Sequence, residues 1–211
     1  MSVFEDLSLL VQQGKAKEVA EVVHSALDGG ATAQQVLDDG LLPGMAVVGE
    51  RFKNNEVFVP EVMISAKALN VGVEILKPLL VSEGVEPIGR VVICTVEGDL
   101  HDIGKNLVKL MMEGVGFDCL DLGADVKAEA IVQAVKEHKA QLVALSAMLT
   151  TTMAQMGKVV EALTAAGLRD QVKVMVGGTP ITDKYCRDIG ADKYAIDAAS
   201  AADAAQALVG K

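Results

Sequence analysis

The chain has 211 residues and a formal net charge of -10, and although 51% of it is apolar it contains no Trp and only four Phe. This length is enough for one or two domains with a substantial hydrophobic core. The negative charge disfavours nucleic acid and anionic membrane as main partners. The chain has no uninterrupted run of about 18 apolar residues, so a transmembrane span is not expected.

The N-terminal sequence and the cysteines favour a cytoplasmic protein. The first residues, MSVFEDLSLLVQQGK, include acidic side chains and lack the basic n-region of a secretory signal peptide. Cys94, Cys119 and Cys186 are odd in number and show no CxxC spacing, so neither a disulfide framework nor a zinc cluster is expected. Cys94 lies inside an apolar strand candidate and Cys119 near another, so we expect both to be small core residues.

The first 85 or so residues predict helices only. Apolar residues recur at helical spacing, and Gly14 and the pair Gly29-Gly30 stand where two of the helices should end. Thr32 can cap a third helix, and Pro43 and Pro60 stand at the starts of two more. The expected helices cover about Phe4–Val11, Ala16–Leu27, Thr32–Gly40, Pro43–Phe52 and Pro60–Leu80. Short amphipathic helices joined by brief turns are typical of a small helical bundle.

Beyond this bundle the pattern changes to alternating strands and helices. The stretch Val81–Arg90 contains Gly, Pro and charges, and it predicts a linker between a helical domain of residues 1–85 and a second domain of residues 90–211. The strand candidates are Val91–Val96, Asp118–Leu122, Leu142–Ser146, Lys173–Val176 and Lys193–Ala195, and the helices between and after them are Ile103–Val115, Ala128–His138, Thr151–Ala166, Thr182–Ile189 and Ala201–Val209. Five such units predict an α/β fold with a doubly wound, five-stranded parallel sheet of flavodoxin-like or Rossmann-like type.

Three loops at the carboxyl ends of the predicted strands carry residues that could bind a ligand, because open α/β sheets bind ligands at that edge. The first contains Asp99 and His101, the second is the hydroxyl-rich stretch from Ser146 to Met153, and the third begins with Gly177-Gly178. Asp99 is close enough in the chain to accept a hydrogen bond from one ring nitrogen of His101. The other nitrogen would then offer its lone pair to a metal.

Each of these features has a simpler explanation when it is taken alone. Asp99 could cap a helix beside an exposed histidine, the Ser/Thr run could be a helix cap with solvated hydroxyls, and the two glycines could form an ordinary tight turn.

Common types of catalytic and nucleotide site do not fit these loops. The first loop lacks GxGxxG and a Walker sequence, Ser146 stands where a receiver domain would need an Asp, and no nucleophile elbow is present. A zinc enzyme needs about three protein ligands, but His24 and His138 lie away from the loops. A single imidazole indicates a metal that brings most of its own ligands, as a macrocycle does.

Three motifs in order carry a resemblance to a known family. They are Asp99-Leu100-His101-Asp102-Ile103-Gly104, which matches Asp-x-His-x-x-Gly; Ser146-Ala147-Met148, which matches Ser-x-Leu with Met148 in place of Leu; and Gly177-Gly178. The stretch from Leu41 to Leu80 also looks like the helical cap of that family. Over nearly its whole length the chain resembles the corrinoid (cobalamin-binding) proteins of methyltransferase systems and the cobalamin-binding region of methionine synthase.

This resemblance implies a cobalamin cofactor, cycling between methylcobalamin and Co(I) corrinoid. It implies that His101 is the axial ligand of cobalt, that Asp99 binds the other ring nitrogen, and that Thr152, where methionine synthase has Ser, is the third member of this relay. The other implied cofactor-binding residues are Asp102, Ile103, Gly104, Ser146, Met148, Thr150, Gly177 and Gly178. Apolar contacts from the cap would come from Met45, Phe52, Phe58, Val59 and Met63, although for any single one of these side chains the core of the bundle is the better explanation.

The function implied by the resemblance is that of a methyl carrier which has no catalytic activity alone. A donor-specific methyltransferase would load a methyl group onto cobalt, and a second methyltransferase would pass it to a thiol or tetrahydropterin. A reductive activator of Co(II) would be a third partner, with no nucleic acid and no membrane involved. The alternatives are a cobalamin-dependent sensor or regulator, the cobalamin-binding subunit of a mutase, and a cofactor-free flavodoxin-like interaction module.

Overall fold

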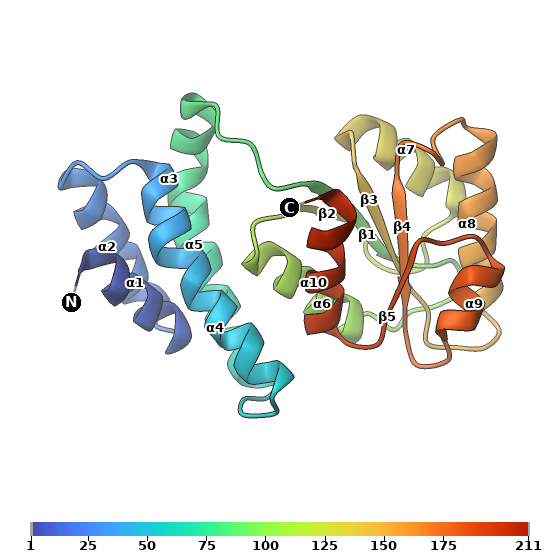
Figure 1. Cartoon of the computed structure of the whole chain (residues 1–211), viewed down its shortest axis with the longest axis horizontal. Helices are drawn as coiled ribbons and strands as arrows, with labels where there is room; N and C mark the ends of the chain where they lie inside the picture. Colours follow the sequence, from blue (N-terminus) through green and yellow to red (C-terminus); the bar gives the residue numbers. More distant parts are fainter. Residues whose placement is uncertain (1, 211) are drawn as a thin grey trace. The chain divides into compact units, whose positions relative to one another are not determined.

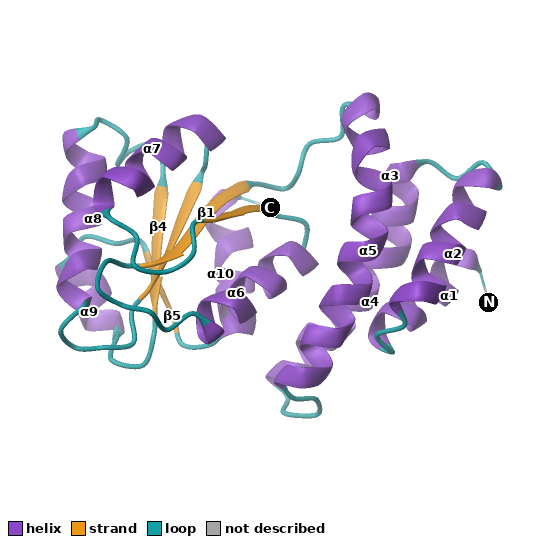
Figure 2. Ribbon diagram, turned by 180° about the vertical axis from the view of Figure 1, so that it is seen from behind, coloured by secondary structure: helices purple, strands orange, loops and turns teal. Residues whose placement is uncertain are grey.

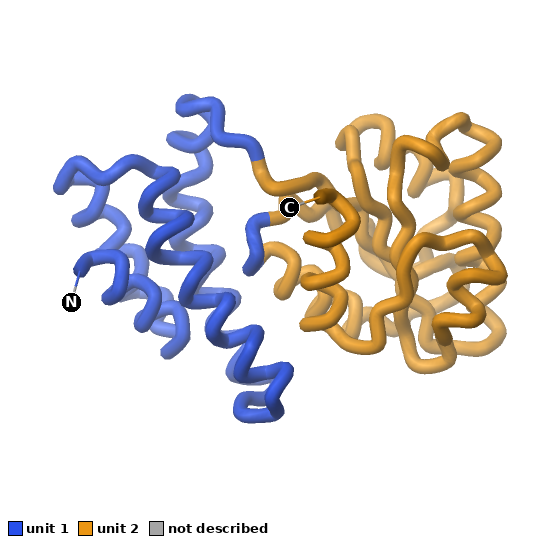
Figure 3. Tube along the Cα trace, viewed as in Figure 1, with its two compact units in different colours: residues 1–86, 114–116 blue, residues 87–113, 117–211 orange. Residues whose placement is uncertain are grey.

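A computed structural model describes residues 2–210, and the chain divides into two compact units (Figure 3). The first unit holds the residues up to 86 together with 114–116, and the second holds 87–113 and the residues from 117 onward.

The first unit is helical, as predicted. It contains α1 (Val3–Gln12), α2 (Ala16–Asp28), α3 (Ala33–Gln35), the π-helix η1 (Val36–Leu41), α4 (Leu42–Lys53) and α5 (Val59–Glu83) (Figure 1). Ser2 and Thr32 form capping boxes with Glu5 and Gln35, which satisfies backbone N–H groups at the starts of α1 and α3. Its core is formed by buried aliphatic side chains, among them Leu7, Val19, Val23, Leu41, Met45, Leu69 and Leu76.

The helix that we expected to end near Gly40 does not end there. Helical structure continues without a turn from Ala33 through η1 and α4 to Lys53. Gly40 is buried, and a Cβ atom on it would lie 3.0 Å from the Leu7 Cδ1 atom. This glycine therefore allows close packing against α1 instead of ending a helix.

The end of α5 also differs from the expectation. The helix continues past Leu80 to Glu83 and ends at Gly84, whose left-handed conformation (φ +71°) is typical of a helix C-terminus. The segment between α5 and the first strand is thus 84–89, shorter than the predicted linker Val81–Arg90.

The second unit contains the predicted five-stranded parallel sheet, in the order β2-β1-β3-β4-β5. The strands are β1 (Arg90–Thr95), β2 (Asp118–Asp121), β3 (Leu142–Ser146), β4 (Lys173–Gly177) and β5 (Lys193–Ala195), and the helices are α6 (Ile103–Gly114), α7 (Ala128–His138), α8 (Met153–Ala165), α9 (Asp183–Asp188) and α10 (Ala198–Val209). The last helix begins three residues earlier than expected because the Asp197 side chain caps it by accepting from the Ser200 N–H group.

Helices cover both faces of this sheet (Figure 2). Side chains of α7 and α8 form one hydrophobic core with the strands, including Ile131 and Val135 from α7 and Met156 and Leu163 from α8. In both ribbon views α6 and α10 lie on the opposite face. The chain therefore leaves the neighbouring strands β1 and β3 toward opposite faces, and the loops after these two strands mark the edge at which such sheets bind ligands.

The described residues include no helix long and apolar enough to cross a membrane. The three cysteines are free, and burial raises the pKa of the Cys94 thiol to about 12. Cys94 is the core residue that we expected, whereas Cys119 is only half-buried.

Candidate functional site

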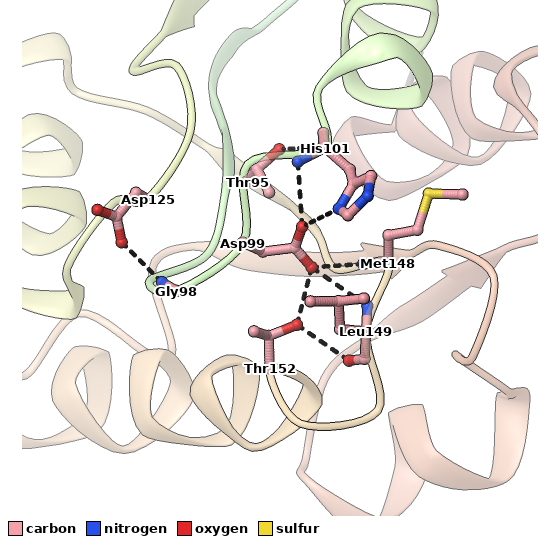
Figure 4. Close-up of polar contacts among 8 residues, drawn as sticks. All are labelled: Thr95, Gly98, Asp99, His101, Asp125, Met148, Leu149 and Thr152. Atoms are coloured by element: carbon pink, nitrogen blue, oxygen red, sulfur yellow. Dashed lines mark hydrogen bonds and ion pairs between the residues drawn. The ribbon is translucent and has the colours of Figure 1, made fainter.

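A buried carboxylate joins the loops that follow β1 and β3 (Figure 4). The side chain of Asp99 has no exposed surface, and its two oxygens have five hydrogen-bond partners. Oδ1 accepts from the backbone N–H of His101 at 3.1 Å and lies 2.8 Å from its Nδ1 atom. Oδ2 accepts from the backbone N–H groups of Met148 at 2.7 Å and Leu149 at 3.2 Å, and from the Thr152 hydroxyl at 2.8 Å.

These hydrogen bonds keep Asp99 ionised. Burial by itself raises the pKa of this carboxyl, but hydrogen bonds from the Met148 backbone, from His101 and from Thr152 outweigh that effect and hold the pKa well below its usual range. An ionised carboxylate facing Nδ1 favours the proton on that nitrogen, so Nε2 carries the lone pair of the neutral ring. The His101 side chain is 51% exposed, which leaves Nε2 accessible to a ligand.

Thr152 stands at the N-cap position of α8 but does not cap that helix with its side chain. Its hydroxyl lies 2.8 Å from Asp99 Oδ2 and 2.9 Å from the Leu149 carbonyl oxygen, and the residue is buried. A solvated helix cap therefore does not describe this threonine. The structure brings it together with Asp99 and His101, the arrangement that the resemblance implied.

The surface around His101 is apolar and open. Leu100, Ile103 and Met148 expose 76%, 78% and 49% of their surface. A Cβ atom added to Gly104 would have no heavy atom within 4 Å. Large apolar side chains are seldom left in solvent as a group unless they meet a partner, and this set fits a broad, flat group that approaches the imidazole.

The other expected site residues differ in how far they are exposed. Asp102 is exposed and accepts a hydrogen bond from the Asn106 side chain at 3.2 Å. Ser146, the last residue of β3, is half-buried, and Thr150 is exposed. Both lie at the same edge of the sheet as Asp99.

The two glycines after β4 are constrained by the protein itself. Gly178 has φ +126°, and a Cβ atom on it would lie 1.9 Å from the Ala147 carbonyl oxygen. At Gly177 the nearest atom would be the Ala195 carbonyl oxygen at 3.2 Å. The close approach of backbone to backbone therefore explains Gly178 before any ligand is considered, in agreement with the tight-turn alternative.

The apolar residues expected to face a cofactor from the helical unit divide into two groups. Met45 is 2% exposed and belongs to the core of that unit, whereas Phe58 and Met63 are 64% and 55% exposed. Phe52 and Val59 are half-buried. Met45 thus follows the core alternative, and Phe58 and Met63 remain available for contact.

Two polar residues that the sequence analysis missed hold the backbone of this site. The Thr95 hydroxyl, which is fully buried, donates to the His101 carbonyl at 3.0 Å. Asp125 accepts from the Gly98 N–H group at 2.7 Å. Thr95 lay within an apolar, β-branched run, and Asp125 is 27 residues from its partner. The one hint in the sequence was that Thr95 ends a strand and Asp125 follows a strand, both at the edge of the sheet that carries Asp99.

A buried ion pair, also missed, lies at the start of α6. The Lys105 side chain is 1% exposed, and its Nζ atom lies 2.6 Å from both carboxylate oxygens of Asp121 and 2.6 Å from Asn106 Oδ1. Burial raises the pKa of Asp121, but hydrogen bonds from Lys105 and from the Gly123 backbone outweigh it, so the pKa lies below its usual value. The pair connects α6 to the end of β2.

Within residues 2–210 no group of three or more His, Cys, Asp or Glu side chains could hold a metal ion. A metal bound by His101 must therefore bring its other ligands with it. A corrin ring does so, because it supplies the equatorial nitrogens itself.

Comparison with known families identifies the cofactor of this protein. A family model described as a B12 binding domain matches residues 89–209, and a second with the same description matches residues 3–77. The chain belongs to the corrinoid proteins. Its cofactor is a corrinoid of the cobalamin type, as the resemblance implied.

Relatives of this corrinoid protein match most or all of its length. It is 39% identical over 214 residues to a corrinoid protein of Desulfitobacterium hafniense, covering 100% of this chain and 99% of the relative. It is 44% identical over 177 residues to trimethylamine corrinoid protein 1 of Methanosarcina acetivorans, covering 83% and 82% of the two chains.

Solved structures also match this chain over nearly its whole length. A chain in the crystal structure of the methanol:cobalamin methyltransferase complex from Methanosarcina barkeri matches with a TM-score of 0.90 at 30% identity, over 99% of this chain and 80% of that one. A cobalamin-binding protein from Desulfitobacterium hafniense matches with a TM-score of 0.78 at 34% identity, over 99% and 98% of the two chains.

Proposed function

We propose that this corrinoid protein carries a methyl group between two methyltransferases. A donor-specific enzyme loads the methyl group, and a second enzyme transfers it to a thiol or tetrahydropterin. When bound, the corrinoid supplies the cobalt to which the methyl group is attached. The observation that carries this proposal is the fully buried Asp99, which orients the one imidazole at the ligand-binding edge of the sheet.

In this proposal His101 would hold the cobalt through its Nε2 atom. Asp99 keeps the proton on Nδ1 and orients the ring, a role that partners of metal-bound histidines commonly have. Because the pKa of Asp99 is held well below its usual range, this carboxyl stays ionised beside the ring. If a proton occupied Nε2 in place of a metal, the Asp99 carboxylate would stabilise the positively charged ring.

The proposed partners are the two methyltransferases and a reductive activator. It provides one helical unit and one α/β unit, and the donor and acceptor chemistry belongs to the two methyltransferases. The reductive activator of Co(II) would be the third partner. The likeness to a chain of the methanol:cobalamin methyltransferase complex, and to relatives named for trimethylamine and monomethylamine, supports a methyltransferase partner.

The test is a reconstitution with purified components. The protein is loaded with cobalamin, reduced, and mixed with a methyltransferase encoded beside its gene and with methanol, methylamines or glycine betaine in turn. We expect the absorption of the corrinoid to change with one donor class, and a thiol or tetrahydropterin to be methylated once the second enzyme is added. A protein that prefers adenosylcobalamin, or that shifts DNA in electrophoresis, and shows no transfer would contradict the proposal.

A further inference from the structure

The turn before Asp99 is held by a residue that the proposed mechanism does not use. In this turn the Asp99 N–H group donates to the Val96 carbonyl at 3.1 Å, and Gly98 adopts φ +81°. Asp125, which follows β2, contacts the turn twice. Its Oδ1 atom accepts from the Gly98 N–H group at 2.7 Å (Figure 4). Its own N–H group donates to the Asp99 carbonyl at 3.0 Å. The two bonds bracket the Gly98–Asp99 peptide.

Asp125 is itself fixed by the backbone around it. The Thr95 N–H group donates to the Gly123 carbonyl at 2.9 Å, the Val126 N–H group donates to the Thr95 carbonyl at 3.1 Å, and Val96 and Val126 form an isolated parallel bridge. Between these contacts Asp125 has φ +57°. Asp is among the few residues other than Gly that adopt this left-handed conformation readily, so the position suits a residue with a short carboxylate.

We propose that Asp125 is a positioning residue for His101. It holds the turn from which Asp99 reaches the imidazole, while the Thr95 hydroxyl holds the His101 carbonyl on the other side. Loss of the carboxylate frees the Gly98 peptide, and the contact between Asp99 Oδ1 and His101 Nδ1 is then kept for less of the time. This inference rests on the proposed role of His101 as axial ligand, but its first test does not need the cofactor.

Two substitutions separate the carboxylate from the backbone conformation. Asp125→Gly keeps the left-handed conformation and removes the acceptor, whereas Asp125→Asn keeps both an acceptor oxygen and tolerance of that conformation. Lys139→Gly is the matched control, because Lys139 has φ +53°, is exposed, and lies at the C-terminus of α7, in the connection that enters β3.

The first test is nitrogen NMR of the histidine rings in the protein without cofactor. We expect a protonated, hydrogen-bonded Nδ1 at His101 in the wild type, in Asp125→Asn and in Lys139→Gly. In Asp125→Gly this signal should broaden or disappear, while the thermal unfolding midpoint stays within the range of the Lys139→Gly control. A role limited to stability would lower the midpoint and leave the ring signal unchanged, which would overturn the inference.

The second test uses the protein loaded with cobalamin. At fixed pH, visible absorption should show the ratio of His-bound to His-free cobalt falling by about three- to tenfold in Asp125→Gly, the span expected for the loss of one ordinary hydrogen bond, with Asp125→Asn close to the wild type. An unchanged ratio overturns the inference. If the wild type itself shows no ligation by His101, the axial assignment fails, and the ring signal alone then decides whether Asp125 positions His101.

Discussion

The hydrogen bonds around Asp99 make a carboxylate necessary at this position. Three of its partners are backbone N–H groups, of His101, Met148 and Leu149, and a backbone donor cannot turn into an acceptor. They are divided between the two oxygens, so both oxygens must accept. Among side chains of this size, only an ionised Asp has two acceptor oxygens and no donor.

This geometry predicts the effect of Asp99→Asn on stability. Whichever way the amide is turned, its NH2 group faces at least one backbone N–H group and leaves a buried donor unsatisfied. We expect a loss of about 1–3 kcal/mol in the free energy of unfolding, measured by urea denaturation of the protein without cofactor. Asp102→Asn, at an exposed neighbouring carboxylate, is the control and should change little. Equal stabilities of the two variants would contradict the assigned hydrogen bonds.

The low pKa of Asp99 predicts how this difference depends on pH. The folded-state pKa lies below the unfolded value of about 3.9. The stabilisation is therefore fully present above about pH 4 and is lost as pH falls toward the folded-state pKa. The gap in unfolding free energy between the wild type and Asp99→Asn should narrow as the pH falls below about 4. A gap that stays constant over this range would mean that the carboxyl is not ionised preferentially in the folded protein.

His101 is expected to control the spectrum of the bound cofactor. His101→Ala should still bind some cobalamin, since under the proposed function other residues would also contact it, but it should lose the His-bound absorption spectrum and transfer methyl groups more slowly. His138→Ala is the control, because that imidazole lies at the end of α7 and contacts the Asp118 carbonyl oxygen at 3.4 Å. The axial assignment would be wrong if the His101 variant kept the wild-type spectrum.

At the scale of elements, the ion pair between Lys105 and Asp121 holds α6 against β2. The ammonium group is almost completely buried, while the carboxylate side chain is 20% exposed. Buried pairs of this kind add little net stability over apolar residues, but removal of one partner leaves a charge without compensation. The pair therefore fixes the place of α6 relative to the sheet more than it strengthens the fold.

Substitutions in this pair should show that the loss of one partner destabilises the protein more than the replacement of both. Lys105→Met is expected to lower the free energy of unfolding by about 3 kcal/mol, the lower end for a broken buried pair because Asp121 keeps some exposure. Lys105→Met combined with Asp121→Asn should recover part of this loss. Lys109→Met is the control, since Lys109 is 30% exposed and lies 3.9 Å from Asp121; we expect less than about 1 kcal/mol. A double variant less stable than Lys105→Met would refute the ion-pair explanation.

At the scale of the whole molecule, the chain joins a helical unit and an α/β unit that match two B12 binding domain models. Such a molecule can bind the cofactor. Under the proposed function it also supplies a ligand to the cobalt and depends on other proteins for the donor and the acceptor. Its net charge of -10 is compatible with a role among soluble protein partners.

This dependence predicts the behaviour of the protein loaded with methylcobalamin. By itself it should transfer methyl groups to a thiol only at the rate of free methylcobalamin, and transfer should accelerate when the acceptor methyltransferase is added. Product formation with and without that enzyme is the measurement. Rapid transfer by the protein alone would mean that the chain contains an acceptor site of its own.

The sequence by itself determined the order of the strands and helices, the parallel sheet, and His101 as the one imidazole at its carboxyl edge. These follow from local patterns, since apolar periodicity and turn residues are properties of short segments. The sequence also indicated Asp99 as the partner of this ring, and the resemblance added Thr152, whose hydroxyl lies 2.8 Å from Asp99 Oδ2.

Only the tertiary structure decided which distant residues support the site. Asp125, Thr95 and the pair of Lys105 with Asp121 act through contacts between separate elements, which no short segment can reveal. For the same reason Gly40, expected to end a helix, proved to be a packing contact with Leu7. Gly178, which the resemblance implied as a cofactor-binding residue, also lies where a Cβ atom would meet the Ala147 carbonyl oxygen. A glycine has the same local preferences in both settings, and only the atoms packed against it show which one applies.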